Sequence, residues 1–135
     1  VLRDAGIPFT LMPLDCTHQA LTTQKRVEAF RTMPNKSGPA TAAMLDFFER
    51  FDENKYGTDG GPLHDPCVIA WLLKPELFQG RLVNVSVECE SELTMGATVV
   101  DWWKITKRPP NAQVMRSVDA EGFYNLLIDR IANLP

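Results

Sequence analysis

The sequence predicts an α/β fold: an open, mostly parallel sheet with helices on both faces and an added antiparallel strand pair. Three observations support this. Residues 7–14 form a continuous apolar run after a glycine, which is typical of a buried parallel strand. Apolar residues then recur with helical spacing in residues 24–51. After Gly80 the apolar period falls to two, which indicates strands joined by short loops.

Length and composition limit the classes of protein. The 135 residues suffice for one domain, 1–135, with a real core. The formal net charge of -3 gives no reason to expect nucleic acid or a membrane surface as a partner. No apolar stretch approaches the roughly 20 residues of a membrane helix, and no signal peptide is visible at the start. The three cysteines are far apart, so we expect reduced thiols in a cytoplasmic protein.

The first third of the chain predicts one strand and one helix. The strand at residues 7–14 is followed by Asp15, Cys16, Thr17 and His18, at the strand end where open α/β sheets place their ligands. Thr22 or Thr23 then caps a helix at about residues 24–32. Residues 33–39 contain repeated helix breakers and predict a loop.

The middle third predicts two buried helices around a polar segment. The first helix covers about residues 40–51 and carries a stripe expected to be buried. Residues 52–61 are polar and glycine-rich, so we expect them to be exposed and mobile. The second helix covers residues 66–73 and is apolar nearly all round, which places it at the centre of the core. The stripe of the first helix consists of Ala43, Met44, Phe47, Phe48 and Phe51.

The last third predicts three strands and a helix. The strands lie near residues 82–89, 98–105 and 112–118, and the short loop at 107–111 favours antiparallel pairing of the last two. Asp119 caps an amphipathic helix. Its inward side chains are Phe123, Leu126, Leu127, Ile128 and Ile131.

The most informative stretch is GGPLHDP at residues 60–66. A glycine- and proline-rich turn brings His64 and Asp65 to the start of an apolar helix. Histidine titrates near neutral pH and can transfer a proton. Asp65 has two interpretations, a helix N-cap followed by Pro66 or an oxygen ligand for a metal. His18, just past a strand end, is either a structural histidine or a residue of the pocket rim, and we favour the structural interpretation.

Four segments in order resemble the inosine-uridine-preferring nucleoside hydrolases. Residues 7–18 are similar to a strand followed by the family's PLD-x-TH motif, and residues 56–66 to its catalytic loop. Residues 94–101 are similar to its T-x-G-x-T-x-x-D turn, and residues 111–123 to its closing strand and helix. The family's N-terminal aspartate cluster, D-x-D-x-x-x-D-D, is absent. The resemblance therefore implies the C-terminal portion of an open, mostly parallel Rossmann-like sheet.

The resemblance also implies an activity and a set of site residues. The family hydrolyses the N-glycosidic bond of ribonucleosides with a Ca²⁺ ion. By resemblance, His64 is the catalytic donor to the leaving base, Asp65 is one Ca²⁺ ligand, and Tyr56 and Asp52 lie with His64 near the base. The remaining ligands and the general base would come from residues absent from this chain, so we expect the chain alone to be inactive. The family implies a homodimer or homotetramer of the full-length protein.

Two other functions are compatible with the residues. In one, the chain is a non-catalytic α/β module in which His64 and Asp65 are structural and which acts by association. In the other, it is a small-molecule-binding α/β domain of another class. An aspartate-rich turn encoded upstream of Val1 would favour the enzyme.

Overall fold

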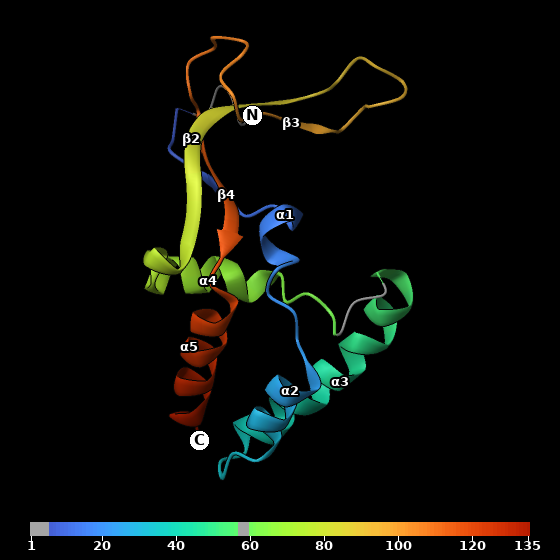
Figure 1. Ribbon diagram of the computed structural model, residues 1–135, viewed down its shortest axis with the longest axis vertical. Coiled ribbons are helices and arrows are strands. Elements are labelled where there is room, and N and C mark those ends of the chain that lie inside the picture. Colours follow the sequence, from blue (N-terminus) through green and yellow to red (C-terminus); the bar gives the residue numbers. More distant parts are fainter. Residues whose placement is uncertain (1–5, 57–59) are drawn as a thin grey trace.

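The computed structural model describes residues 6–56 and 60–135, with residues 49–56 described by their backbone alone. Within these residues, a four-stranded sheet and the surrounding helices confirm the α/β class (Figure 1). The strands are β1 (Thr10–Leu11), β2 (Phe78–Val87), β3 (Thr98–Asp101) and β4 (Ala112–Val118). The helices are α1 (Leu14–Thr17), α2 (Gln24–Arg31), α3 (Ser37–Tyr56), α4 (Asp65–Leu73) and α5 (Ala120–Ala132), with a 3-10 turn at Pro75–Leu77.

The sheet is mixed, with the order β1-β4-β2-β3. β1 is parallel to β4, with Thr10 opposite Gln113, whereas β2 is antiparallel to both β4 and β3. The expected pairing of β3 with β4 is wrong. β2 is long enough to serve both, since residues 78–83 pair with β4 and residues 84–87 pair with β3.

β1 is parallel to its neighbour as predicted, but it is much shorter than the apolar run at residues 7–14. Only Thr10 and Leu11 are in the strand, and both are half-buried. Pro8 and Pro13 flank them and have no backbone N–H to donate to a neighbouring strand. β1 is also an edge of the described sheet, so neither face is fully covered there.

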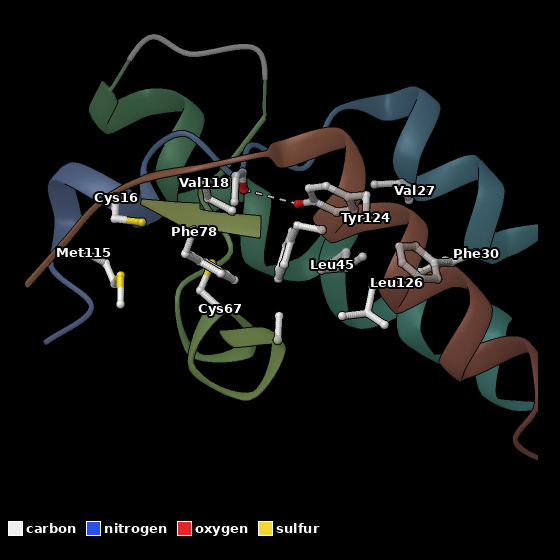
Figure 2. Close-up of a cluster of buried hydrophobic side chains, with 14 residues drawn as sticks. Cys16, Val27, Phe30, Leu45, Cys67, Phe78, Met115, Val118, Tyr124 and Leu126 are labelled. Carbon is white, nitrogen blue, oxygen red and sulfur yellow. Dashed lines mark hydrogen bonds between the residues drawn. The ribbon is translucent and has the colours of Figure 1, made fainter. Parts of the chain in front are cut away.

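Two apolar clusters lie along the sheet. β4 contributes to both, with Ala112 and Val114 in one cluster and Met115 and Val118 in the other. The larger cluster joins β4 and the start of β2 to the five α-helices (Figure 2). Figure 1 shows α4 lying across the start of β2 and the end of β4, with α2, α3 and α5 beyond it. This arrangement brings the N-terminal end of α4 near α1.

Helix α3 differs from the prediction in its length and in the face that it buries. It begins at Ser37, within the expected loop, and extends to Tyr56. Its buried side chains include Ala42 and Leu45, which face the cluster shared with α2. The predicted stripe is not buried: Met44 is 64% and Phe47 62% exposed, and Ala43 and Phe48 are also exposed. The side chain of Phe51 lies outside the described residues.

The apolar sequence of α4 predicted a helix at the centre of the core, and this prediction is wrong. Cys67 and Ala70 are buried, but Ile69 is 58% and Leu72 65% exposed. Val68 and Leu73 are also exposed. One face of α4 packs on α5 and the larger cluster, whereas Val68 and Leu72 line an open hollow of about 590 Å³ together with residues of β1 and β2.

Helices α2 and α5 agree with the prediction within a residue or two. The Asp119 carboxylate accepts a hydrogen bond from the backbone N–H of Gly122 and caps α5. Phe123 and Leu126 are buried, and the other three predicted inward side chains are partly buried. Across the described ranges, no helix combines the length and apolar character required to cross a membrane.

Candidate functional site

His64 and Asp65 lie at the N-terminal end of α4. His64 is the N-cap residue, Asp65 begins the helix and Pro66 lies in its first turn. This start is one residue earlier than predicted, and no side-chain cap bond from His64 is present in the described structure. The interpretation of Asp65 as a helix N-cap is therefore wrong. The His64 side chain is half-buried, and the Asp65 side chain is exposed.

The turn before His64 is anchored to the segment that follows α1. The backbone N–H of Leu63 donates to the carbonyl of Ala20 at 2.9 Å, and the N–H of Thr22 donates to the carbonyl of Gly61 at 2.8 Å. Gly60 has φ +96°, and a Cβ there would lie 2.1 Å from the Thr22 carbonyl oxygen. Only glycine fits such a position without displacement of the backbone.

This close packing corrects the prediction of exposure at Gly60 and Gly61, the end of the segment 52–61 that was expected to be exposed and mobile. Residues 52–56 extend α3, Gly60 and Gly61 are buried, and residues 57–59 lie outside the described residues. The burial follows from the two backbone hydrogen bonds that join the turn to residues 20–22. These hydrogen bonds therefore fix the backbone of the turn that precedes His64.

The buried hydroxyls of Tyr124, on α5, and Thr22 stabilise the segment 20–22 on which the turn is held. The Tyr124 hydroxyl donates to the Ala20 carbonyl at 3.2 Å and lies 2.8 Å from Thr22 Oγ1. Since its single proton is directed to Ala20, the Thr22 hydroxyl is the donor to the tyrosine oxygen. The Arg26 guanidinium lies over the Tyr124 ring at 4.2 Å and donates to the Leu21 carbonyl at 2.6 Å.

The first and second predicted motifs meet at His64. Thr17 Oγ1, at the end of α1, lies 2.7 Å from His64 Nδ1, and the Thr17 side chain is only 2% exposed. The His18 and His64 rings have centroids 5.4 Å apart and are tilted by 51°. The sequence analysis did not identify Thr17 as a site residue, although the PLD-x-TH motif contains it.

Asp65 supplies one oxygen donor group suitable for a hard cation. Ca²⁺ takes 6–8 oxygen ligands, so one carboxylate is a small part of its coordination. Among the side chains that the structure describes, those of residues 6–48 and 60–135, no group of three or more His, Cys, Asp or Glu could hold a metal ion. The described residues therefore do not make a Ca²⁺ site by themselves.

Tyr56 and Asp52 belong to the last turns of α3. Residues four apart lie on one face of a helix, so the backbone places both on the same side of α3. Their side chains lie outside the described residues, and their predicted contact with the base stays a prediction.

Side chains of the third and fourth motifs hold neighbouring backbone groups by hydrogen bonds. The Asp101 carboxylate accepts hydrogen bonds from the backbone of Ile105 and from the backbone and hydroxyl of Thr106. The Thr106 hydroxyl is the main reason that the pKa of Asp101 is lowered. The Asn111 side chain bonds both the N–H and the C=O of Val85, which extends the strand pairing. The tip between β2 and β3 lies far from α4 (Figure 1).

Two buried thiols lie behind the site. Burial raises the pKa of Cys16 to about 11 and that of Cys67 to about 12 from an ordinary value of 9.0. The Cys67 thiol donates to the Leu63 carbonyl at 3.1 Å. Both thiols are free, as predicted, and stay protonated at neutral pH. They serve packing and not nucleophilic chemistry.

A cavity of about 490 Å³ lies apart from His64 and Asp65, neither of which lines it. Trp102 and Arg116 contribute to its wall, and the guanidinium groups of Arg81 and Arg116 each lie 4.9 Å from the Trp102 ring centre. These stacked side chains connect β2, β4 and the residues after β3. The cavity thus lies at the sheet, and Pro13, Leu14 and Asp15 of the first motif also line it.

Comparisons with known proteins agree with the motif order. An uncharacterized protein of Schizosaccharomyces pombe is 50% identical over all of this chain, which covers 44% of that protein. The pyrimidine-specific ribonucleoside hydrolase RihA of Shewanella sp. (strain MR-4) is 46% identical over 98% of this chain and 42% of the enzyme. The chain thus spans less than half the length of these relatives.

Solved structures share the fold. The purine-preferring ribonucleoside hydrolase from Gardnerella vaginalis superposes with a TM-score of 0.80 at 32% identity, covering 94% of this chain and 40% of that one. A plant nucleoside hydrolase, PpNRh1, superposes at 0.82 over 96% of this chain and 42% of its own, with 24% identity. Residues 1–125 match the family described as inosine-uridine preferring nucleoside hydrolase. With its motifs in the family's order and its fold shared, this chain belongs to the inosine-uridine preferring nucleoside hydrolase family.

Proposed function

We propose that this chain supplies the leaving-group side of a ribonucleoside hydrolase, an enzyme that converts a ribonucleoside and water to ribose and a free base. The observation that carries the proposal is the pairing of a held imidazole, His64, with an exposed carboxylate, Asp65, on consecutive residues. The relatives named as ribonucleoside hydrolases support the reaction class. The whole active site would combine this chain with residues beyond it.

The chemistry needs a proton donor near the base. When the bond between C1′ and the base nitrogen breaks, the base leaves with the electron pair and water adds to C1′. Negative charge builds on the base in the transition state, so a donor placed there lowers the barrier. In the proposal His64 is this donor, and its anchored loop holds the imidazole in place.

Asp65 is proposed as one ligand of a Ca²⁺ ion whose other ligands come from outside the described residues. When bound, such an ion would bind the ribose hydroxyls and the attacking water. Asp65 is exposed beside His64, so a ribose held at its carboxylate would have its base near the imidazole. Tyr56 and Asp52 are proposed to contact that base from the end of α3.

The proposal includes the cytoplasm as the compartment and a homodimer or homotetramer as the assembly. The free thiols of Cys16 and Cys67 support a reducing compartment. The exposed apolar side chains of α3 and α4 support an assembly, because patches of this kind often mark contacts with other protein surfaces.

The test is hydrolysis of uridine and inosine by the intact protein with Ca²⁺, followed by the release of ribose. We expect His64→Ala to lower kcat by about 10²-fold or more, with a smaller change in KM, because His64 acts as the base departs. His18→Gln is the matched control and is expected to retain most of the activity. The 135-residue chain alone is expected to be inactive.

Three outcomes would contradict the proposal. An unchanged kcat for His64→Ala would reject the donor role, and hydrolysis by the isolated chain with Ca²⁺ would reject the shared site. An intact protein that binds nucleosides but cleaves none would favour the non-catalytic alternative.

A further inference from the structure

The Thr17 hydroxyl is a buried polar group with a defined partner. Its side chain is 2% exposed, and Oγ1 lies 2.7 Å from His64 Nδ1, a short hydrogen bond between groups 47 residues apart in the chain. Burying a hydroxyl without a partner is costly, whereas a buried valine of the same shape carries no such cost. The hydrogen bond is thus the feature that distinguishes threonine from valine at this position.

Thr17 is held on a rigid element. The Thr17 backbone N–H donates to the Pro13 carbonyl at 3.1 Å within α1, and the neighbouring Cys16 is fully buried in the larger cluster. The Gln19 side-chain amide, just past the helix, donates to the Asp15 carbonyl at 2.7 Å and to the Arg116 carbonyl of β4 at 2.8 Å. These bonds tie α1 to the sheet, so Thr17 Oγ1 is a fixed point against which another side chain can be aligned.

We propose that Thr17 is a positioning residue for His64, which it orients toward the leaving base. The terminal torsion of a histidine side chain has a broad energy minimum, so the backbone alone does not fix the ring. A hydrogen bond at Nδ1 fixes the ring plane and the direction of Nε2, which lies on the far side of the imidazole. Thr17 does not touch the substrate. This inference rests on the proposed function of His64.

The competing explanation is that Thr17 only fills space beneath α4. Thr17→Val keeps the shape and removes the hydrogen bond, whereas Thr17→Ser keeps the hydroxyl and removes a methyl group. A packing role predicts a larger loss for Thr17→Ser, or equal losses. A positioning role predicts loss for Thr17→Val and rescue by Thr17→Ser.

The experiment compares the intact wild-type protein, Thr17→Val and Thr17→Ser on two substrates. On uridine or inosine, we expect Thr17→Val to lower kcat about tenfold, as the loss of one aligning hydrogen bond would, with KM little changed. On a riboside whose leaving group is the stable 4-nitrophenolate anion, the same variant should lose far less, because that group departs without a donor. Thr17→Ser should restore most of the activity on the natural nucleosides.

A second measurement does not depend on activity. The ring ¹⁵N resonances of His64, assigned with His64→Gln and recorded at one pH where the ring is neutral, report which nitrogen carries the proton. We expect one tautomer in the wild type and in Thr17→Ser, and a shifted mixture in Thr17→Val. Unchanged resonances in Thr17→Val, or equal loss on both ribosides, would overturn the positioning role. If the intact protein hydrolyses no nucleoside, the proposed function fails, and these resonances still decide the role of Thr17.

Discussion

The turn that carries His64 and the outer faces of α3 and α4 differ in one respect. The polar groups of the turn have partners among the described residues, whereas the apolar side chains of the outer faces stay largely exposed. In the turn, the carbonyl of Gly61 and the N–H of Leu63 both have backbone partners in residues 20–22. On the outer faces, Phe47 and Leu72 are more than half exposed, although their sequence is as apolar as that of a core. The two regions adjoin, since the turn leads directly into α4.

Backbone hydrogen bonding and apolar burial are therefore completed separately in this chain. Backbone polar groups near His64 find partners locally because unpaired buried polar groups are costly. Burial stabilises a fold by about 25 cal/mol for each Å² of apolar surface that is removed from water. On the outer faces, more than half of the surface of Phe47 and Leu72 stays exposed among the described residues. The turn therefore has one conformation set by this chain, while the outer faces are suited to contact another protein surface.

The largest effect is expected for Gly60→Ala in the anchored turn. An added Cβ would lie 2.1 Å from the Thr22 carbonyl oxygen, and the left-handed φ of +96° adds its own cost. We expect a loss of roughly 3 kcal/mol in the free energy of unfolding, because the clash adds to backbone strain of about 1–2 kcal/mol. Urea denaturation of the intact protein measures it.

Gly96→Ala is the matched control for this change. Gly96 also has a left-handed φ, +84°, but no atom lies within 4 Å of the position of its Cβ. It should therefore cost only the backbone strain, about 1 kcal/mol. Equal losses for the two substitutions would show that the turn is not tightly packed on Thr22.

A smaller effect is expected for Tyr124→Phe, which removes the buried hydroxyl beneath the turn. The change leaves the buried Thr22 hydroxyl without this partner, whereas the Ala20 carbonyl still accepts a hydrogen bond from the N–H of Leu63. We expect a loss of about 1–2 kcal/mol in the free energy of unfolding, the cost of leaving one buried hydroxyl unsatisfied.

A double-mutant cycle with Thr22→Val tests whether the two hydroxyls act together. If they do, the double variant should lose less than the sum of the two single variants. Simple additivity would indicate that the Thr22–Tyr124 hydrogen bond does not stabilise the turn.

The smallest effect is expected on the outer face of α4. Ile69→Gln and Leu72→Gln should change the unfolding free energy of the 135-residue chain by no more than about 0.5 kcal/mol, because both side chains are exposed. Both substitutions should reduce self-association of the protein in sedimentation experiments. Lys74 is also exposed, and Lys74→Gln should not reduce it. A loss above about 2 kcal/mol in the 135-residue chain would mean that this face is already buried.

The predictions from sequence succeeded where the signal was local. The Asp119 cap and the spacing of Phe123 and Leu126 predicted α5, because a helix forms its hydrogen bonds within a few residues. The sequence placed His64 and Asp65 at the start of a helix for the same reason. Periodicity failed for Met44 and Phe47, since it shows that a face is apolar but not that another element covers it.

By itself, the sequence determined the α/β class, the helices with clear caps and spacing, and the residues whose chemistry and order define the family. Only the tertiary structure decided that Thr17 meets His64, that Gly60 packs against Thr22, and which faces of α3 and α4 stay exposed. The physical reason is that contacts across tens of residues depend on how the sheet and helices pack, and a local pattern carries no information about its distant neighbour.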